Sequence, residues 1–127
     1  MRALVIDDSR VMRRIVSGIL TPLGFETVEA EHGRAALDVL ESGMPVDLAC
    51  VDWNMPVMDG LEFVTSVRAN RAWRNVTLMM VTTESETGQI VRALAAGAHE
   101  YVIKPFTPDA IREKLQLLGL VDQEESA

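Results

Sequence analysis

Residues 48–60, LACVDWNMPVMDG, join an apolar run to an acidic residue and a turn, and they indicate how the whole chain folds. The run Leu48–Val51 is short and apolar throughout, which is typical of a strand buried on both faces of a parallel sheet. It leads directly into Asp52, and further on Asp59 and Glu62 have the spacing of a helix-capping box. This stretch therefore predicts a buried strand, an acidic strand end and a helix that follows the turn.

The same alternation of strand and helix extends over the rest of the chain. The other short apolar runs lie at Ala3–Ile6, Thr27–Ala30, Leu78–Val81 and Tyr101–Ile103. Each run is followed by a segment with apolar residues at helical spacing, such as Val11, Ile15 and Ile19 after the first. Parallel strands that are joined through helices have helices on both faces of the sheet. We therefore predict one α/β domain in which five strands alternate with five helices.

Length and composition limit the classes of protein to which the chain can belong. With 127 residues, 48% of them hydrophobic and 24% charged, it has the size and composition of one globular domain. Lysine and arginine number 12 against 19 acidic residues, and the net charge of −7 argues against general binding of nucleic acids or anionic membranes. A single cysteine, Cys50, excludes an internal disulfide and a multi-cysteine zinc site, and we expect it to be buried.

The two ends of the chain carry no targeting or membrane signal. The apolar run at the N-terminus meets Asp7 too early for a signal peptide, and no stretch approaches the roughly 20 apolar residues of a membrane span. We therefore expect a soluble, cytoplasmic protein with no membrane partner. The domain is expected to cover residues 1–120, because Val121–Ala127 is polar and acidic and suits a frayed tail.

Polar residues follow the predicted strands at the ends where open parallel α/β sheets build their sites. They are Asp7, Asp8, Asp52, Thr82, Thr83, Glu84 and Lys104, the last followed by Pro105. Each has an ordinary interpretation on its own, since Asp8 could cap a helix, Asp52 could begin a turn and Lys104 could be solvated. Because all of them share the position at a strand end, a joint site is the better hypothesis.

The residue types in this set point to phosphoryl transfer. Three carboxylates at one edge repel each other, which favours raised pKa values or a bound cation. An all-oxygen set suits Mg²⁺, which binds with few protein ligands, several waters and a phosphate. Lys104 suits contact with a phosphoryl oxygen as a point charge, and Thr82 can donate a hydrogen bond to another. Positioning and electrostatic stabilisation supply most of the catalysis in such reactions.

The complete set resembles the signature of receiver domains of two-component response regulators. The resemblance rests on Asp7-Asp8, Asp52, Thr82 and Lys104-Pro105, together with Asp52-Trp53-Asn54-Met55-Pro56 and Met58-Asp59-Gly60. It extends over residues 2–118 and is especially close to the stand-alone chemotaxis regulators of the family. It implies a flavodoxin-like (βα)5 three-layer sandwich with a five-stranded parallel sheet of order 2-1-3-4-5. It also implies a cis peptide bond between Lys104 and Pro105.

The resemblance assigns chemical roles to these residues. Asp52 is implied to be the nucleophile that accepts a phosphoryl group from a phosphohistidine of a histidine kinase. Asp7, Asp8 and Asp52 are implied to bind Mg²⁺ together with the backbone carbonyl of Asn54. The ion and Lys104 screen the charge that otherwise opposes attack by a carboxylate on an anionic donor. The chain is thus expected to be a phospho-accepting switch and not an enzyme with an external substrate.

Thr82 and Tyr101 are implied to form the switch. Phosphorylation adds negative charge at Asp52, Thr82 moves towards it, and the ring of Tyr101 turns inward into the vacated space. The surface formed by the fourth helix, the fifth strand and the fifth helix changes as a result. Residues expected on that surface are Ile90, Leu94, Ala98, Tyr101 and Lys114.

Two further positions are implied to set the lifetime of the phosphoryl group. Asn54 and Glu84 lie two residues beyond Asp52 and Thr82, and their side chains could orient a water for hydrolysis within seconds to minutes. The chain departs from the chemotaxis regulators at Thr83, where an alanine is usual. It also lacks the paired lysines of the enterobacterial protein in the segment 85–88, so the partner contacts of that protein do not carry over.

Several alternative functions are weighed against this one. Within the family, output through a flagellar motor switch protein competes with a shuttle role, in which phosphate passes to a histidine phosphotransfer protein. A Mg²⁺-dependent phosphatase of the haloacid dehalogenase type also uses an aspartate nucleophile, but it has a second aspartate where this chain has Asn54. A flavodoxin-like nucleotide binder is disfavoured, because the chain has no glycine-rich phosphate loop. His32 and His99 have no partner at metal-ligand spacing.

Overall fold

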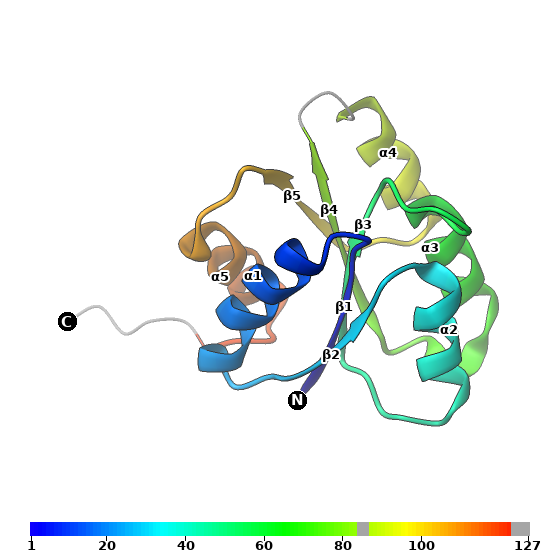
Figure 1. Cartoon of the computed structure of the whole chain (residues 1–127), viewed down its shortest axis with the longest axis horizontal. Coiled ribbons are helices and arrows are strands. Elements are labelled where there is room, and N and C mark those ends of the chain that lie inside the picture. Colours follow the sequence, from blue (N-terminus) through cyan, green and yellow to red (C-terminus); the bar gives the residue numbers. More distant parts are fainter. Residues whose placement is uncertain (84–86, 123–127) are drawn as a thin grey trace.

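The five apolar runs of the sequence are the strands of one parallel sheet, shown in Figure 1. The computed structural model describes residues 1–83 and 87–122. Within these ranges the strands are β1 (Arg2–Ile6), β2 (Glu26–Ala30), β3 (Leu48–Asp52), β4 (Thr77–Thr83) and β5 (Glu100–Lys104). The helices are α1 (Arg10–Leu20), α2 (Gly33–Glu41), α3 (Gly60–Ala69), α4 (Thr87–Ala96) and α5 (Pro108–Leu117), with short 3₁₀ turns η1 (Thr21–Leu23) and η2 (Arg71–Trp73). The predicted alternation is confirmed, although helical spacing did not predict the two 3₁₀ turns.

The order of the strands brings the ends of β1 and β3 side by side. The sheet has the order β2-β1-β3-β4-β5, and every neighbouring pair is parallel. This confirms the flavodoxin-like topology implied by the resemblance. The strand order reverses between β1 and β3, which is where open α/β sheets form their binding crevice. Because Ile6 pairs with Val51, the residues that follow, Asp7 and Asp52, emerge at neighbouring positions of the same edge.

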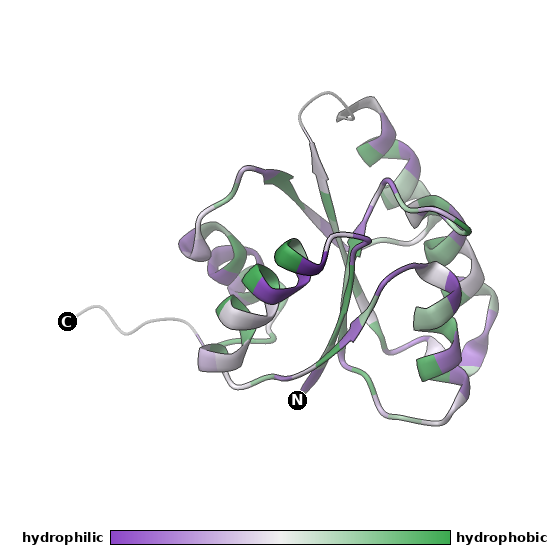
Figure 2. Cartoon of the chain, viewed as in Figure 1, coloured by the Kyte–Doolittle hydropathy of each residue, from purple (hydrophilic) through white to green (hydrophobic). Residues whose placement is uncertain are grey.

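Two apolar cores lie on opposite faces of the sheet. On one face α1 and α5 contribute residues such as Leu20 and Ile111, and on the other α2 and α3 contribute residues such as Leu37 and Phe63, with α4 beside them (Figure 1). Cys50 is buried in the first core, as predicted. In Figure 2 apolar residues colour much of the central strands, whereas polar residues are concentrated in the outer parts of the helices and in turns. Burial of both faces explains why the central strands β1, β3 and β4 are largely apolar without alternation.

Side chains that precede the helices determine where four of them begin. Ser9, His32, Asp59 and Thr107 each accept a hydrogen bond from a backbone N–H in the first turn of α1, α2, α3 and α5. The cap at Asp59 confirms the sequence prediction. The cap of α1 is Ser9, so Asp8 does not have the capping role that it could have had.

The segment after α5 differs from the expected frayed tail at its start. Val121 packs against the core beneath α1 and α5, next to Leu118 and Leu120. The rest of the expected tail, residues 123–127, lies outside the described residues. In the part of the chain that the structure describes, no helix is long and apolar enough to cross a membrane.

Candidate functional site

Asp7, Asp8 and Asp52 form an acidic cluster at the carboxyl edge of the sheet. Asp7 and Asp8 directly follow β1, and Asp52 is the last residue of the neighbouring β3. One carboxylate oxygen of each residue lies within 4.8 Å of those of the other two. Asp7 and Asp52 are buried, with 4% and 7% of their surface exposed, whereas Asp8 is exposed. Carboxylate oxygens that are held by the fold on one side and open to water on the other fit a hard divalent cation such as Mg²⁺.

Lys104 joins this cluster from β5, the strand at one side of the sheet. Its Nζ lies 3.3 Å from Asp7 Oδ2 and 3.3 Å from Asp52 Oδ1. It is the last residue of β5, and the bond to Pro105 is cis, as the resemblance implied. Side chains alternate between the faces of a strand, so Asp52 lies on the face of Cys50 and Lys104 on the face of Val102, which is the α1 and α5 side in both cases. One ammonium group among three carboxylates leaves an excess of negative charge, which a divalent cation would balance.

Arg13 and Ser9 hold Asp7 in place. The Arg13 Nη1 donates to the backbone carbonyl of Asp7 at 2.7 Å, and its Nε donates to Glu29 Oε1 at 3.2 Å. The backbone N–H of Ser9 donates to Asp7 Oδ1 at 2.8 Å, and that of Asp7 donates to the Ala30 carbonyl at 3.1 Å. These bonds fix one acid of the cluster against both α1 and β2. The sequence analysis missed Arg13, although a basic residue in the first turn of a helix after an acid pair was an available signal.

The environment of the Asp52 carboxyl raises its pKa. Burial is the main cause, the negative charge of Asp7 adds to it, and Lys104 partly offsets both, so that the pKa of Asp52 is about 6. For Lys104, burial alone would lower the pKa, but the charges of Asp52 and Asp7 and the hydrogen bonds to them outweigh burial and raise it. Lys104 is therefore protonated and Asp52 mostly ionised near neutral pH. An ionised carboxylate and a fixed ammonium group thus lie side by side.

The start of α3 is packed tightly against Asp52. A Cβ atom on Gly60 would lie 2.9 Å from the backbone oxygen of Asp52 and 2.9 Å from Met80 Cε, so only glycine fits without a shift. Val57 has a φ of 69°, which is unfavourable for a β-branched residue, and 76% of its surface is exposed. The predicted carbonyl ligand Asn54 lies in the loop between β3 and α3, with its side chain exposed. Gly60 is a second residue that the sequence analysis did not place in the site.

The two predicted switch residues lie on the other face of the sheet. Thr82 pairs with Ile103 and Tyr101 pairs with Met80, and the alternation of side chains puts all four on the side of α2, α3 and α4. Thr82 follows Val81, the partner of Asp52 in the register, and only 2% of its surface is exposed. Thr82 therefore lies on β4, between β3, which carries Asp52, and β5, which carries Tyr101. The predicted role of Glu84 falls outside the described residues.

The residues expected on the output surface differ in their accessibility. Leu94 has 39% of its surface exposed, the Lys114 side chain 28%, and Tyr101 is half-buried. Ile90 and Ala98 are buried, with 8% exposed each, and Ala98 belongs to the core on the side of α2 and α3. Val91 on α4, in contrast, is 70% exposed and lies at the surface.

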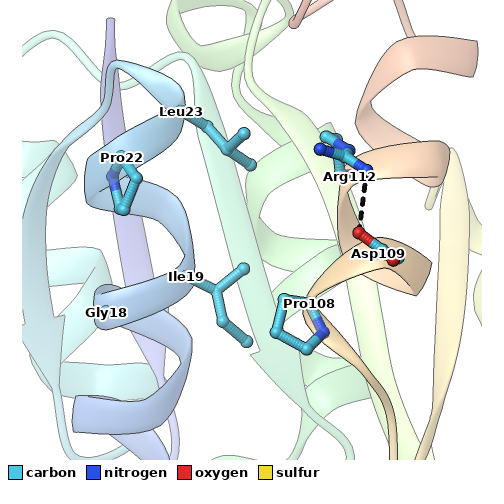
Figure 3. Close-up of a pocket in the computed structure, with 7 residues that line it drawn as sticks. All are labelled: Gly18, Ile19, Pro22, Leu23, Pro108, Asp109 and Arg112. Atoms are coloured by element: carbon cyan, nitrogen blue, oxygen red, sulfur yellow. Dashed lines mark hydrogen bonds and ion pairs between the residues drawn. The ribbon is translucent and has the colours of Figure 1, made fainter. Parts of the chain in front are cut away.

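A separate apolar cavity lies between α1 and α5, as Figure 3 shows. Its volume is about 210 Å³, and its lining residues are Gly18, Ile19, Pro22, Leu23, Pro108, Asp109 and Arg112. No residue of the acidic cluster lines it, so it is not the site of the expected chemistry. Arg112 is held at its rim by an ion pair of 2.8 Å with Asp109.

The histidines have structural contacts. His32 Nδ1 accepts a hydrogen bond from the Ala35 backbone at the start of α2. His99 Nδ1 accepts one from the Leu78 backbone at 3.1 Å and lies 3.3 Å from the Arg68 guanidinium, which together with burial lowers the pKa of His99, burial being the larger cause. Among the described residues, neither belongs to a group suited to a metal ion.

An α/β protein with an acidic cluster and a lysine at the switch point of its sheet belongs to a recognisable class. Residues 3–116 match the response regulator receiver domain family, and the chain belongs to this family. It is 46% identical to a chemotaxis protein CheY homolog of Campylobacter jejuni, over 100% of this chain and 99% of the relative. The solved structure of Vibrio cholerae CheY4 superposes with a TM-score of 0.83 at 35% identity, covering 91% of this chain and 96% of that chain. The response regulator TrrA of Thermotoga maritima, solved in complex with Mg²⁺-BeF, has a TM-score of 0.80 at 30% identity, covering 92% of this chain and 97% of that chain.

Proposed function

We propose that the chain is a phosphorylation-driven switch that accepts a phosphoryl group on Asp52 from a phosphohistidine of a histidine kinase. Asp7, Asp8, Asp52 and the backbone carbonyl of Asn54 would hold Mg²⁺. The observation that carries this proposal is the contact of Lys104 with both Asp7 and Asp52, with the Asp8 oxygens next to them. The complex of TrrA with Mg²⁺-BeF supports the choice of metal for a relative of this fold.

The residues of the site suggest how the transfer proceeds. An ionised oxygen of Asp52 attacks the phosphorus atom, a bond between that oxygen and phosphorus forms, and the bond between phosphorus and the histidine nitrogen breaks. The freed imidazole keeps the electron pair and takes up a proton from water. Lys104 neutralises negative charge on the phosphoryl oxygens, and a bound Mg²⁺ supplies Lewis-acid charge stabilisation. Arg13 and Ser9 keep Asp7 fixed, so the site needs little rearrangement.

The donor protein needs a surface next to this site. Val11 and Ile15 on α1 are 69% and 47% exposed, and they lie close after the Asp7-Asp8 pair in the chain. Exposed apolar residues of this size that follow one helix face are typical of a protein contact. We expect the phosphodonor to dock there.

The output is a change at the surface of α4, β5 and α5. Phosphorylation draws the Thr82 hydroxyl towards the new charge, and the ring of Tyr101, on the same face, turns inward. Leu94, Val91 and Lys114 then form the surface that a downstream protein reads. The similarity to chemotaxis regulators favours signalling to the flagellar motor over a shuttle to a histidine phosphotransfer protein.

The test uses a small-molecule phosphodonor, so that no cognate kinase is needed. The purified protein is incubated with acetyl phosphate and Mg²⁺, and the phosphorylated fraction is read from the intact mass. We expect one added phosphoryl group on the wild type and on Asp38→Asn, a matched charge change on the exposed side of α2. We expect none on Asp52→Asn or in the presence of a chelator. Equal labelling of wild type and Asp52→Asn would refute the proposal.

A further inference from the structure

Glu100 covers the open side of the edge strand β5. β5 is the last strand of the sheet, so β4 pairs with only one of its sides. On the open side, the backbone N–H of Tyr101 donates to Glu100 Oε1 at 3.0 Å. Lys114 Nζ, from α5, donates to the same oxygen at 3.1 Å. The two side chains are only 20% and 28% exposed, so this ion pair is better shielded from water than a surface pair.

The same ammonium group lies on the ring of Tyr101. Lys114 Nζ is 4.6 Å from the centroid of the ring, within the range of a cation–π contact. Tyr101 is thus bound to Glu100 through its backbone and to Lys114 through its ring. These three residues, which we call the Tyr101 latch, connect β5 to α5 within the expected output surface.

Glu100 keeps the ammonium group of Lys114 over the ring of Tyr101. A lysine ammonium is strongly hydrated and sits on a flexible chain of four carbons, so by itself it would hold a ring weakly. The Glu100 oxygen is fixed by the Tyr101 backbone, and it in turn keeps Lys114 over the ring. When the ring turns away, the ammonium loses its contact with the ring face but keeps its ion pair. Rotation is therefore opposed as long as Glu100 holds Lys114 in place.

We propose that Glu100 is a positioning residue of the switch, which sets the ring equilibrium of Tyr101 through Lys114. The effect of Glu100 on signalling rests on the proposed function, whereas the contacts of the Tyr101 latch do not depend on it. The latch biases the unphosphorylated protein towards the ring position seen in the structure. Loss of the contact should raise the population of the turned ring about two- to fivefold, which is the equilibrium change that corresponds to a cation–π contact at a partly exposed site.

The test exploits the fact that Tyr101 is the only tyrosine of the chain. Protein with 3-fluorotyrosine gives one ¹⁹F resonance, which is recorded with and without Mg²⁺ and beryllofluoride. We expect Glu100→Gln and Lys114→Gln to shift the resonance of the free protein towards the position that beryllofluoride produces in the wild type. Lys114→Arg, which keeps the cation and the ion pair, should stay near the wild type. The control is Glu113→Gln, which makes the same charge change as Glu100→Gln at the exposed neighbour of Lys114.

The outcomes separate the latch from the function on which its output rests. Free-state resonances of Glu100→Gln and Lys114→Gln that coincide with the wild type, or an equal shift in Glu113→Gln, would overturn the latch. If beryllofluoride leaves the wild-type resonance unchanged, the proposed switch fails, while an altered line width of the ring signal in Glu100→Gln relative to the wild type still supports the latch. Thermal unfolding of each variant identifies any loss of fold, and Lys114→Arg, which keeps the charge, keeps the test informative if Glu100→Gln unfolds.

Discussion

Replacing Asp52 by asparagine should stabilise the folded protein when no divalent cation is present. The fold holds this carboxylate in a buried position next to Asp7, and the pKa of Asp52 is raised from 3.8 to about 6 as a result. A raised carboxyl pKa means that ionisation costs folding free energy. Asparagine has nearly the same shape and carries no charge, so the variant avoids that cost.

The size and the pH dependence follow from the same pKa. At about 1.36 kcal/mol for each pKa unit, the difference gives at most about 3 kcal/mol. The site opens to water beside the exposed Asp8, and screening reduces the expected gain to about 1–2 kcal/mol at pH 7.5. Between pH 3.8 and about 6 the folded state binds more protons than the unfolded chain, so wild-type stability falls as the pH rises through this window. The gain of the variant should therefore be small near pH 4 and constant above pH 6.5.

Urea unfolding followed by circular dichroism in the presence of a chelator measures this gain. Asp38→Asn, on the exposed side of α2, is the control and should show no such gain. Mg²⁺ should stabilise the wild type more than Asp52→Asn, because the variant lacks one ligand. A variant that is less stable than the wild type at pH 7.5, or a gain that does not depend on pH, would show that the carboxylate is not electrostatically strained.

Three further variants test the packing around the site by the same unfolding assay. Val57→Asn should raise the unfolding free energy by about 1 kcal/mol, because asparagine tolerates the positive φ at this position better than valine; no gain would mean that the loop relaxes freely. Gly60→Ala should lower it by about 1–3 kcal/mol through overpacking and should also weaken Mg²⁺ binding, measured by titration calorimetry. An unchanged Mg²⁺ affinity would show that Gly60 does not influence the geometry of the acidic cluster. Arg68→Ala should cost about 2–3 kcal/mol, since its guanidinium donates to the carbonyls of Gly97 at 3.0 Å and Val76 at 2.6 Å; a loss below about 0.5 kcal/mol would contradict that role.

The sequence predicted the sheet and the acidic cluster because both depend on short-range patterns. Apolar runs such as Leu48–Val51 form buried strands wherever helices cover both faces, and the ends of parallel strands meet at one edge. Asp7, Asp52 and Lys104 could therefore be placed together without coordinates. The strand order and the cis bond before Pro105 came from the family resemblance, because nothing in the local sequence determines them.

Contacts made by long side chains could not be predicted in this way. The bond from Arg13 to the Asp7 carbonyl and the ion pair of Lys114 with Glu100 depend on how a helix is rotated against the sheet. Ile90 is also buried, although the resemblance placed it on the output surface. Apolar spacing predicts that a helix has a buried face, but it does not determine which residues lie at the border of that face.

The central claim, that Asp52 captures the phosphoryl group, is tested most directly by locating the modified residue. The wild-type protein is phosphorylated with acetyl phosphate and Mg²⁺, reduced with borohydride, which converts an acyl phosphate of aspartate into homoserine, and mapped by peptide mass spectrometry. We predict homoserine at position 52 and at no other aspartate, and only in samples that contained Mg²⁺. Homoserine at Asp7 or Asp8 in place of Asp52, or reduction that is independent of Mg²⁺, would contradict the account.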